Sequence, residues 1–239
     1  MISIKDLKKV YGKQTVLNGV TTTIQKGQVV AIVGSSGSGK STLLRCVNRL
    51  ETPDAGEVSL NGVRVTPETL PQIREKVGMV FQNFNLFSHM TVMQNLIYAP
   101  THVKGMAKDA AIEKAKTLLA QVGLAHKAES YPQRLSGGEK QRIAIARTLM
   151  LDPEVILFDE PTSALDPEMV QEVLRVIKSL SSTGITMLIV THEMAFVRDV
   201  ADRVLFVDRG KIIEDRETED FFECHDNDRV IAFLNKKKS

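Results

Sequence analysis

The stretch QVVAIVGSSGSGKSTLLR, residues 28–45, decides the fold of this 239-residue chain. Its apolar and β-branched residues 29–33 predict a buried strand, and a glycine-rich loop follows at residues 34–39. The tripeptide KST then opens a predicted helix that continues over residues 43–50. A strand, a glycine loop and a helix in this order give the spacing G-x-x-x-x-G-K-[ST] the context of a phosphate-binding loop.

The chemistry of this loop suits a triphosphate. Glycines let the backbone curl so that successive N–H groups point inward, and the N-terminus of the following helix adds partial positive charge. Lys40 is expected to reach the β- and γ-phosphates, and the Ser41 hydroxyl is expected to bind Mg²⁺. The predicted phosphate-binding residues are Gly34, Ser35, Ser36, Gly37, Ser38, Gly39, Lys40, Ser41 and Thr42.

Two other interpretations fit the loop less well. A flexible serine and glycine linker would not lie between a predicted strand and a predicted helix. The dinucleotide fingerprint G-x-G-x-x-G cannot be laid on residues 34–39 without losing a glycine. The chain is therefore predicted to bind a nucleoside triphosphate.

Composition narrows the class of partner and the compartment. The 31 Lys and Arg residues nearly balance the 29 Asp and Glu residues, and a net charge of +2 gives no basic footprint for nucleic acid. Cys46 and Cys224 are far apart in the sequence and fit neither a disulfide framework nor a zinc site. No signal-peptide core and no apolar run long enough to span a bilayer occurs, so we expect a cytosolic chain whose membrane association goes through a partner.

Strand patterns in the first third predict a small antiparallel sheet beside the nucleotide-binding unit. Residues 2–7 alternate apolar and polar side chains, and residues 19–24 form a second strand pattern. Residues 57–60 and 63–65 flank Asn61-Gly62, which is the strongest short signal for a β-hairpin.

The rest of the chain alternates predicted helices with buried strands. Helical spacing over residues 92–99 and 108–122, punctuated by Pro100 and Gly123, and a third helix over residues 138–151 predict a helical insertion. Further strands are predicted at residues 77–81, 155–158, 185–190, 204–207 and 211–214, and a further helix at residues 167–180.

Together these patterns predict one α/β domain over residues 1–239 with a mostly parallel sheet covered on both faces. Residues 1–83 and 152–239 would form the catalytic core with its antiparallel part. Residues 84–151 would form an inserted helical subdomain.

Polar residues at the ends of predicted strands complete the expected site. Asp159 closes the apolar strand VILFD, where a carboxylate can hold Mg²⁺ beside a phosphate-binding loop. Glu160 follows it and can accept a proton from an attacking water. Gln82 also follows a strand, and its amide can bind Mg²⁺ or orient water. His192 ends another strand, where a neutral imidazole can hydrogen-bond a γ-phosphate oxygen. Taken singly, each of these residues has a plain structural explanation, so their roles depend on the loop.

The segment LSGGEKQR, residues 135–142, predicts a second anion-binding site. Ser136, Gly137 and Gly138 open a helix, so its free N–H groups and dipole point outward. One nucleotide has a single γ-phosphate, which the first loop already holds. A second site in the same chain therefore implies that a second copy of the chain contributes it.

This set of residues resembles the ATP-binding cassette (ABC) ATPases, and the resemblance covers essentially the whole chain. It implies a P-loop NTPase (RecA-like) core and two cassettes that bind head to tail around two ATP molecules with Mg²⁺. By this resemblance residues 34–42 are the Walker A loop, Tyr11 stacks on adenine, and Gln82 is the Q-loop glutamine. The resemblance also makes Ser136, Gly137 and Gly138 the signature, Asp159 the Walker B aspartate and Glu160 the catalytic glutamate. It makes residues 163–166, which end at Asp166, the D-loop, and His192 the switch histidine. Glu139 stands where glutamine is more usual.

Residues 81–100 and 191–214 are similar to bacterial polar amino acid importers of the histidine, glutamine and arginine type. This resemblance implies an ATPase at the cytoplasmic side of the plasma (inner) membrane, with a separate permease and, indirectly, a substrate-binding protein as partners. Ser88 replaces the proline usual there, and Glu139 is shared with lipoprotein-releasing and cell-division cassettes. An ATPase of such a complex is therefore the alternative. A P-loop kinase or nucleotide switch would explain Lys40 and Asp159 but not residues 136–138.

Overall fold

The computed structural model describes residues 1–223 and 227–238. Its central sheet has six strands in the order β10-β9-β3-β8-β7-β6. Neighbouring strands from β9 to β6 run parallel, and only β10 is antiparallel to its neighbour. The strands are β3 (Val29–Val33), β6 (Val77–Val80), β7 (Val155–Asp159), β8 (Thr186–Val190), β9 (Arg203–Asp208) and β10 (Lys211–Glu217). The expected mostly parallel sheet is confirmed.

A second, antiparallel sheet of four strands has the order β2-β1-β4-β5. It consists of β1 (Ile2–Tyr11), β2 (Gln14–Ile24), β4 (Ala55–Leu60) and β5 (Val63–Arg64). The predicted hairpin turn between β4 and β5 is present, with φ of +49° at Asn61 and +81° at Gly62. Positive φ at both central residues is the type I′ geometry that matches strand twist.

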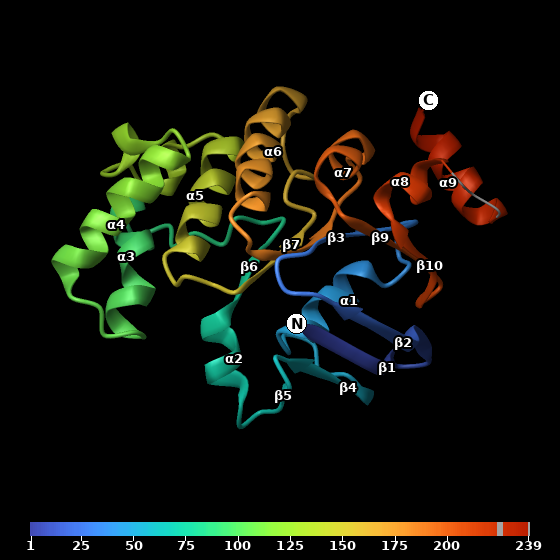
Figure 1. Cartoon of the computed structure of the whole chain (residues 1–239). Coiled ribbons are helices and arrows are strands. Elements are labelled where there is room, and N and C mark those ends of the chain that lie inside the picture. Colours follow the sequence, from blue (N-terminus) through green and yellow to red (C-terminus); the bar gives the residue numbers. More distant parts are fainter. Residues whose placement is uncertain (224–226, 239) are drawn as a thin grey trace.

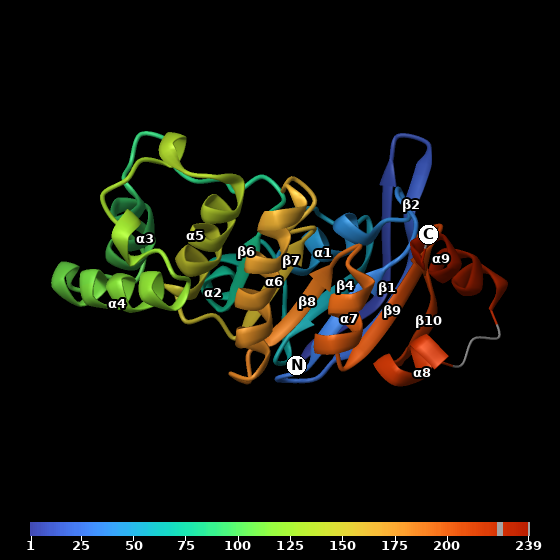
Figure 2. The same ribbon diagram turned by 90° about the horizontal axis from the view of Figure 1, so that it is seen from above.

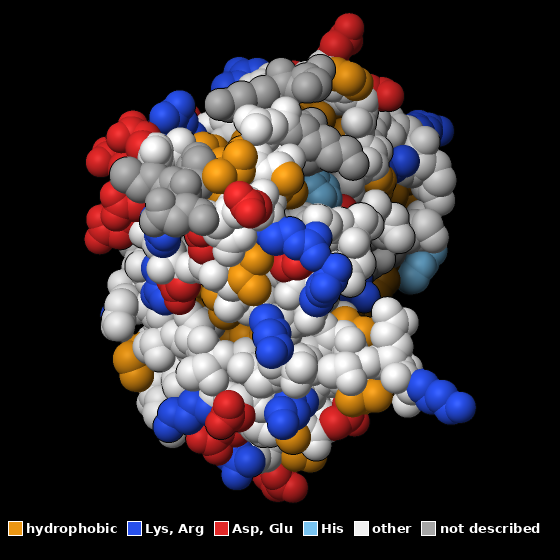
Figure 3. Space-filling view, turned by 90° about the vertical axis from the view of Figure 1, so that its right-hand side faces the viewer, with side chains coloured by type: hydrophobic (Ala, Val, Ile, Leu, Met, Phe, Trp, Pro, Cys, Tyr) orange, Lys and Arg blue, Asp and Glu red, His pale blue; other side chains and the backbone are white. Residues whose placement is uncertain are grey.

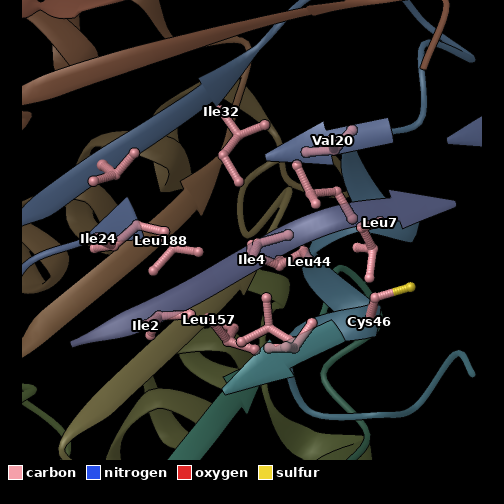
Figure 4. Close-up of a cluster of buried hydrophobic side chains, with 14 of the residues drawn as sticks. Ile2, Ile4, Leu7, Val20, Ile24, Ile32, Leu44, Cys46, Leu157 and Leu188 are labelled. Atoms are coloured by element: carbon pink, nitrogen blue, oxygen red, sulfur yellow. The ribbon is translucent and has the colours of Figure 1, made fainter. Parts of the chain in front are cut away.

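The main core lies between the two sheets and encloses α1 (Lys40–Val47). Figure 4 shows Ile2, Ile4 and Leu7 from the antiparallel sheet meeting Leu157 and Leu188 from the parallel sheet. Strands β3, β7 and β8 are buried along their whole length, because helices or the second sheet cover both faces. The loop that precedes α1 is therefore held between two elements of the main core, β3 and α1.

Helices α6 (Pro167–Ser181) and α7 (Met194–Val200) cover the other face of the central sheet (Figure 1). Helix α6 buries Val170, Val173 and Ile177 at helical spacing against the outward side chains of β7 and β8. Proline in its first turn fits the start of a helix. These helices pack against β7 and β8, the strands that lead to Asp159, Glu160 and His192.

Helices α3 (Val92–His102), α4 (Lys108–Gln121) and α5 (Gly137–Leu149) form a lobe beside the sheet with a hydrophobic cluster of its own (Figures 1 and 2). The 3₁₀ turns Ala125–Lys127 (η1) and Pro132–Arg134 (η2) connect α4 to α5. The prediction that Pro100 ends a helix is wrong, because Pro100 is buried inside α3. Packing in the last turn of α3 outweighs the loss of one backbone donor there.

Four short or terminal helices lack a clear sequence pattern and were not expected from it. They are α7, described above, and α2 (Leu70–Lys76), α8 (Thr218–Glu223) and α9 (Asp228–Lys238). Figure 3 shows basic and acidic side chains interspersed on the face that includes this C-terminal end. Over the part of the chain that the structure describes, no helix has the length and apolar character needed to cross a membrane. Cys224 lies outside the described residues.

Candidate functional site

The loop between β3 and α1 curls tightly against neighbouring backbone, and only glycine fits at its two ends. A Cβ at Gly34 would lie 2.1 Å from the Val207 carbonyl oxygen, and one at Gly39 would lie 2.7 Å from that of Val16. Both glycines also have positive φ, +145° and +104°. Close contacts with neighbouring backbone therefore constrain the shape of the loop.

Lys40 places a buried cation inside this loop. Its side chain comes from the first position of α1, and the residue is 4% exposed. Nζ donates to the carbonyl oxygens of Gly34, at 3.1 Å, and Ser35, at 2.9 Å. The ammonium is therefore positioned at the helix N-terminus, where the dipole also favours an anion.

A pocket of about 330 Å³ opens over the loop. The predicted residues among its lining are Tyr11, Ser36, Gly37, Gly39, Lys40, Ser41, Thr42 and Glu160. Gln14 and Val16 of β2 also line it and were missed, because nothing in their local pattern differs from an ordinary strand. Tyr11 is 43% exposed at the mouth, with Lys9 Nζ 5.0 Å from its ring centroid.

Asp159 lies at the end of β7 and is almost fully buried. Arg45 of α1 pairs with it: Nε lies 3.1 Å and Nη2 2.9 Å from Oδ2. This ion pair was not predicted, because Arg45 and Asp159 are distant in the chain. Oxygen atoms of a carboxylate and a hydroxyl suit Mg²⁺, and Asp159 and Ser41 supply both types. Among the described residues no group of three or more His, Cys, Asp and Glu could hold a metal ion.

Glu160 and His192 meet although they are far apart in sequence. Glu160 follows β7 and His192 follows β8, and these strands are neighbours in the sheet. Nε2 of His192 lies 3.3 Å from Oε1 of Glu160. Glu160 has φ of +48°, which costs energy in a residue other than glycine and is held by its N–H bonding the Val190 carbonyl oxygen at 3.0 Å. Such strain is common where a side chain must be aimed.

The predicted second anion site is a well-formed helix start. Ser136 is the N-cap of α5, and its Oγ accepts from Glu139 N at 3.2 Å. Gly138 is buried against α6, where a Cβ would lie 2.9 Å from Cβ of Met169. Within the described chain, none of residues 136–138 lines the pocket over the loop.

Among the residues that the structure describes, the other predicted site residues outside the lining of that pocket are Gly34, Ser35, Ser38, Gln82, Asp159, Asp166 and His192. Gln82 is exposed just after β6, and Asp166 is exposed at the start of α6. Neither is among the described residues that line the pocket. Their assignments therefore stay predictions.

Comparison with known proteins decides the family. Residues 17–163 match the model of the family described as "ABC transporter". The chain belongs to the ABC transporter family. The cassette is 55% identical to the "Arginine transport ATP-binding protein ArtM" of Bacillus subtilis (strain 168) over 99% of both chains. It is 52% identical to the "L-cystine transport system ATP-binding protein TcyN" of Escherichia coli (strain K12), over 98% of this chain and 97% of the other.

Solved structures agree with the cassette fold. A dimeric post-hydrolysis state of the ATP-binding cassette MJ0796 bound to ADP and Pi superposes with a TM-score of 0.83 at 32% identity, covering 91% of this chain and 99% of the other. This ABC cassette therefore is an ATPase with a P-loop NTPase core, as its sequence motifs predict. ATP is its nucleotide, and six of the nine predicted phosphate-binding residues line the pocket over Lys40.

Proposed function

We propose that this ABC ATPase powers a bacterial importer for a polar amino acid through a separate membrane permease. The observation that carries the proposal is the 55% identity over 99% of both chains with an arginine transport ATP-binding protein. Other relatives at about the same identity are named for transport of cystine and glutamine. These names favour amino acid import over lipoprotein release or cell division.

The proposed hydrolysis starts from a triphosphate held by the loop and Lys40. Ser41, Asp159 and Gln82 would hold Mg²⁺, which when bound neutralises charge on the β- and γ-phosphates. Glu160 would take a proton from the attacking water, because it lines the same pocket as Lys40. His192 would hydrogen-bond a γ-phosphate oxygen and hold the Glu160 carboxylate in place, as their 3.3 Å contact supports.

Two copies of the chain would complete each ATP site, head to tail. Ser136, Gly137, Gly138 and Asp166 of one copy would face the loop of the other copy. The separation of residues 136–138 from the pocket lining of their own chain supports this arrangement. Two solved structures of the cassette MJ0796, at 32–33% identity, are dimeric. ATP would thus bridge the dimer interface through its γ-phosphate.

The permease would dock near residues 84–87, at the cytoplasmic side of the membrane. Phe87 is 40% exposed and lies edge-on to Tyr98, with ring centroids 5.7 Å apart. The side chain of Asn95 holds the backbone of Phe87: its Oδ1 accepts from the Phe87 N–H, and its Nδ2 donates to the Phe87 carbonyl oxygen. Arg147 of α5 donates to the Asn85 carbonyl oxygen at 2.7 Å. An exposed aromatic patch on a fixed loop suits a helix-in-groove contact. The loop is thereby joined to the helix that begins at Ser136.

Reconstitution with its permease tests the proposal. The chain would be co-purified with its permease subunits, placed in lipid nanodiscs and assayed for ATP hydrolysis with and without a substrate-binding protein loaded with arginine, glutamine or cystine. We expect one polar amino acid to stimulate hydrolysis. Stimulation by a lipoprotein instead, or phosphoryl transfer to a small acceptor, would contradict amino acid import.

A further inference from the structure

Glu139 sits at the centre of three contacts around the N-terminus of α5. The Ser136 N–H donates to Oε2 of Glu139 at 2.8 Å, and the Glu139 N–H donates back to Oγ of Ser136 at 3.2 Å. Lys127, the last residue of η1, places Nζ 3.0 Å from Oε1 of Glu139. The two carboxylate oxygens therefore have one partner each, and the cation comes from a different segment.

These contacts keep Glu139 ionised in a partly enclosed place. The side chain of Glu139 is 18% exposed and that of Lys127 27%. Burial by itself would raise the pKa of Glu139, but the Ser136 N–H and the Lys127 ammonium outweigh it and lower the pKa. At neutral pH a full negative charge therefore stands at this helix N-terminus.

That charge conflicts with the role proposed for the same helix start. A phosphate that approaches Ser136, Gly137 and Gly138 would be repelled by an uncompensated carboxylate within the first turn. The neighbouring Arg142 also lowers the pKa of Glu139 through its charge, but less than Lys127 does. The direct contacts of Arg142 are with other groups: its Nη2 lies 3.0 Å from Oε2 of Glu172, and its Nη1 donates to the Val122 carbonyl oxygen. Lys127 is the cation in direct contact with Glu139 among the described residues.

We infer that Lys127 is a positioning residue of the ATP site. Its ammonium neutralises the carboxylate of Glu139, so the reciprocal hydrogen bonds between Ser136 and Glu139 can persist when Ser136 meets the γ-phosphate of the nucleotide held by the second copy. This inference rests on the proposed two-copy site. Because Oγ of Ser136 accepts from Glu139 N, its own O–H can donate outward to an anion. Lys127 acts through Glu139 and touches neither nucleotide nor Mg²⁺.

The backbone contacts of Lys127 do not depend on its charge. Its N–H donates to the Leu124 carbonyl oxygen and its own carbonyl accepts from Ser130 N, each at 2.9 Å. Lys127→Met therefore keeps the backbone turn and most of the apolar stem while removing the ammonium. Glu139→Gln keeps an oxygen that can accept from Ser136 N and removes the negative charge. Lys127→Met and Glu139→Gln therefore test the two charges while changing the size of each side chain little.

The test titrates ATP into a chain carrying Glu160→Gln, which blocks turnover, and measures the dimer fraction by analytical ultracentrifugation. Lys127→Met should raise the ATP concentration for half-maximal dimer formation about tenfold, because an unpaired like charge then opposes the phosphate. Adding Glu139→Gln to Lys127→Met should return that concentration to within about twofold of the parent chain. Fluorescent ATP-analogue binding to the monomer should not change, because the loop over Lys40 is intact.

The matched control is Lys116→Met, which removes the cation of the exposed Lys116–Glu113 pair on α4, 2.7 Å apart, and should leave dimer formation unchanged. Ser136→Ala distinguishes failure of the proposed two-copy ATP site from failure of the role inferred for Lys127. If Ser136→Ala leaves dimer formation unchanged, the two-copy site itself is wrong and the inference falls with it. If Ser136→Ala abolishes dimer formation but Lys127→Met has no effect, or has an effect that Glu139→Gln does not relieve, the inference alone is overturned.

Discussion

The imidazole Nε2 of His192 lies 3.3 Å from the carboxylate Oε1 of Glu160, across the ends of two neighbouring parallel strands. The other ring nitrogen, Nδ1, is buried and has no hydrogen-bond partner in the described part of the chain. A hydrogen on Nε2 would let the ring donate a hydrogen bond to Oε1 of Glu160. The contact therefore holds the carboxylate of Glu160 at the strand end, as its proposed role as a base requires.

Glu160→Gln should lower ATP hydrolysis at least about a hundredfold, because an amide cannot take the proton from water. ATP binding should survive, since the loop and Lys40 do not depend on the carboxylate. Phosphate release measures turnover, and ultracentrifugation with ATP should find a dimer that persists. Near-normal hydrolysis by this variant would rule out Glu160 as the base.

His192→Ala should lower kcat by roughly tenfold to a hundredfold, because Glu160 loses the group that orients it. The ATP concentration for half-maximal binding to the monomer should hardly change, since His192 does not line the pocket over the loop among the described residues. Steady-state kinetics and equilibrium binding separate the two quantities. Equal losses in both would instead indicate a general packing role.

Gly138→Ala should destabilise the fold by about 1–3 kcal/mol, because a new methyl group meets a well-packed neighbour. That Cβ would lie 2.9 Å from Cβ of Met169, an atom fixed to the α6 backbone. Gly137→Ala is the matched control, since the close contact of its Cβ would be with the movable Cδ2 of Leu165, also at 2.9 Å, and its other neighbours lie at ordinary contact distances. Thermal denaturation should give a lower Tm for Gly138→Ala than for Gly137→Ala. The reverse order would contradict the packing argument.

Phe87→Ala should weaken attachment to the permease while the isolated chain keeps its ATPase activity. The side chain is 40% exposed and contributes apolar area to the proposed docking surface. Co-purification yield measures attachment and phosphate release measures activity. Tyr131→Ala, an exposed aromatic residue outside residues 84–87, serves as the control. Equal yields for the two variants would remove Phe87 from the docking surface.

Cys46 should stay unreactive toward DTNB at pH 8 in the folded chain. Burial, followed by the nearby Glu51 carboxylate, raises the pKa of its thiol to about 12. Because the pKa is raised on folding, the protonated thiol favours the folded state below its ordinary pKa, and this contribution is lost as pH rises toward about 12. A chain with Cys224→Ser should release thionitrobenzoate only after urea unfolding. Rapid release without urea would show that Cys46 is accessible.

The glycine loop, the hairpin turn and the capped start of α5 were all predicted from the sequence. Each is made by residues adjacent in the chain, so residue type and spacing suffice: Asn61-Gly62 takes positive φ, and Ser136 caps the helix three residues before Glu139. Pro100 shows the limit of local signals. Its helix continues because the buried cluster of the helical lobe outweighs one missing donor.

The sequence by itself determined the family of motifs and the strand ends that carry Asp159, Glu160 and His192. Only the tertiary structure decided which charges meet: Arg45 with Asp159, His192 with Glu160, and Lys127 with Glu139. The physical reason is that strand order and helix packing, set by burial of apolar faces far along the chain, fix distances between residues with no local relationship. A pattern of neighbours encodes a loop, whereas an ion pair between distant segments exists only once the sheet has formed.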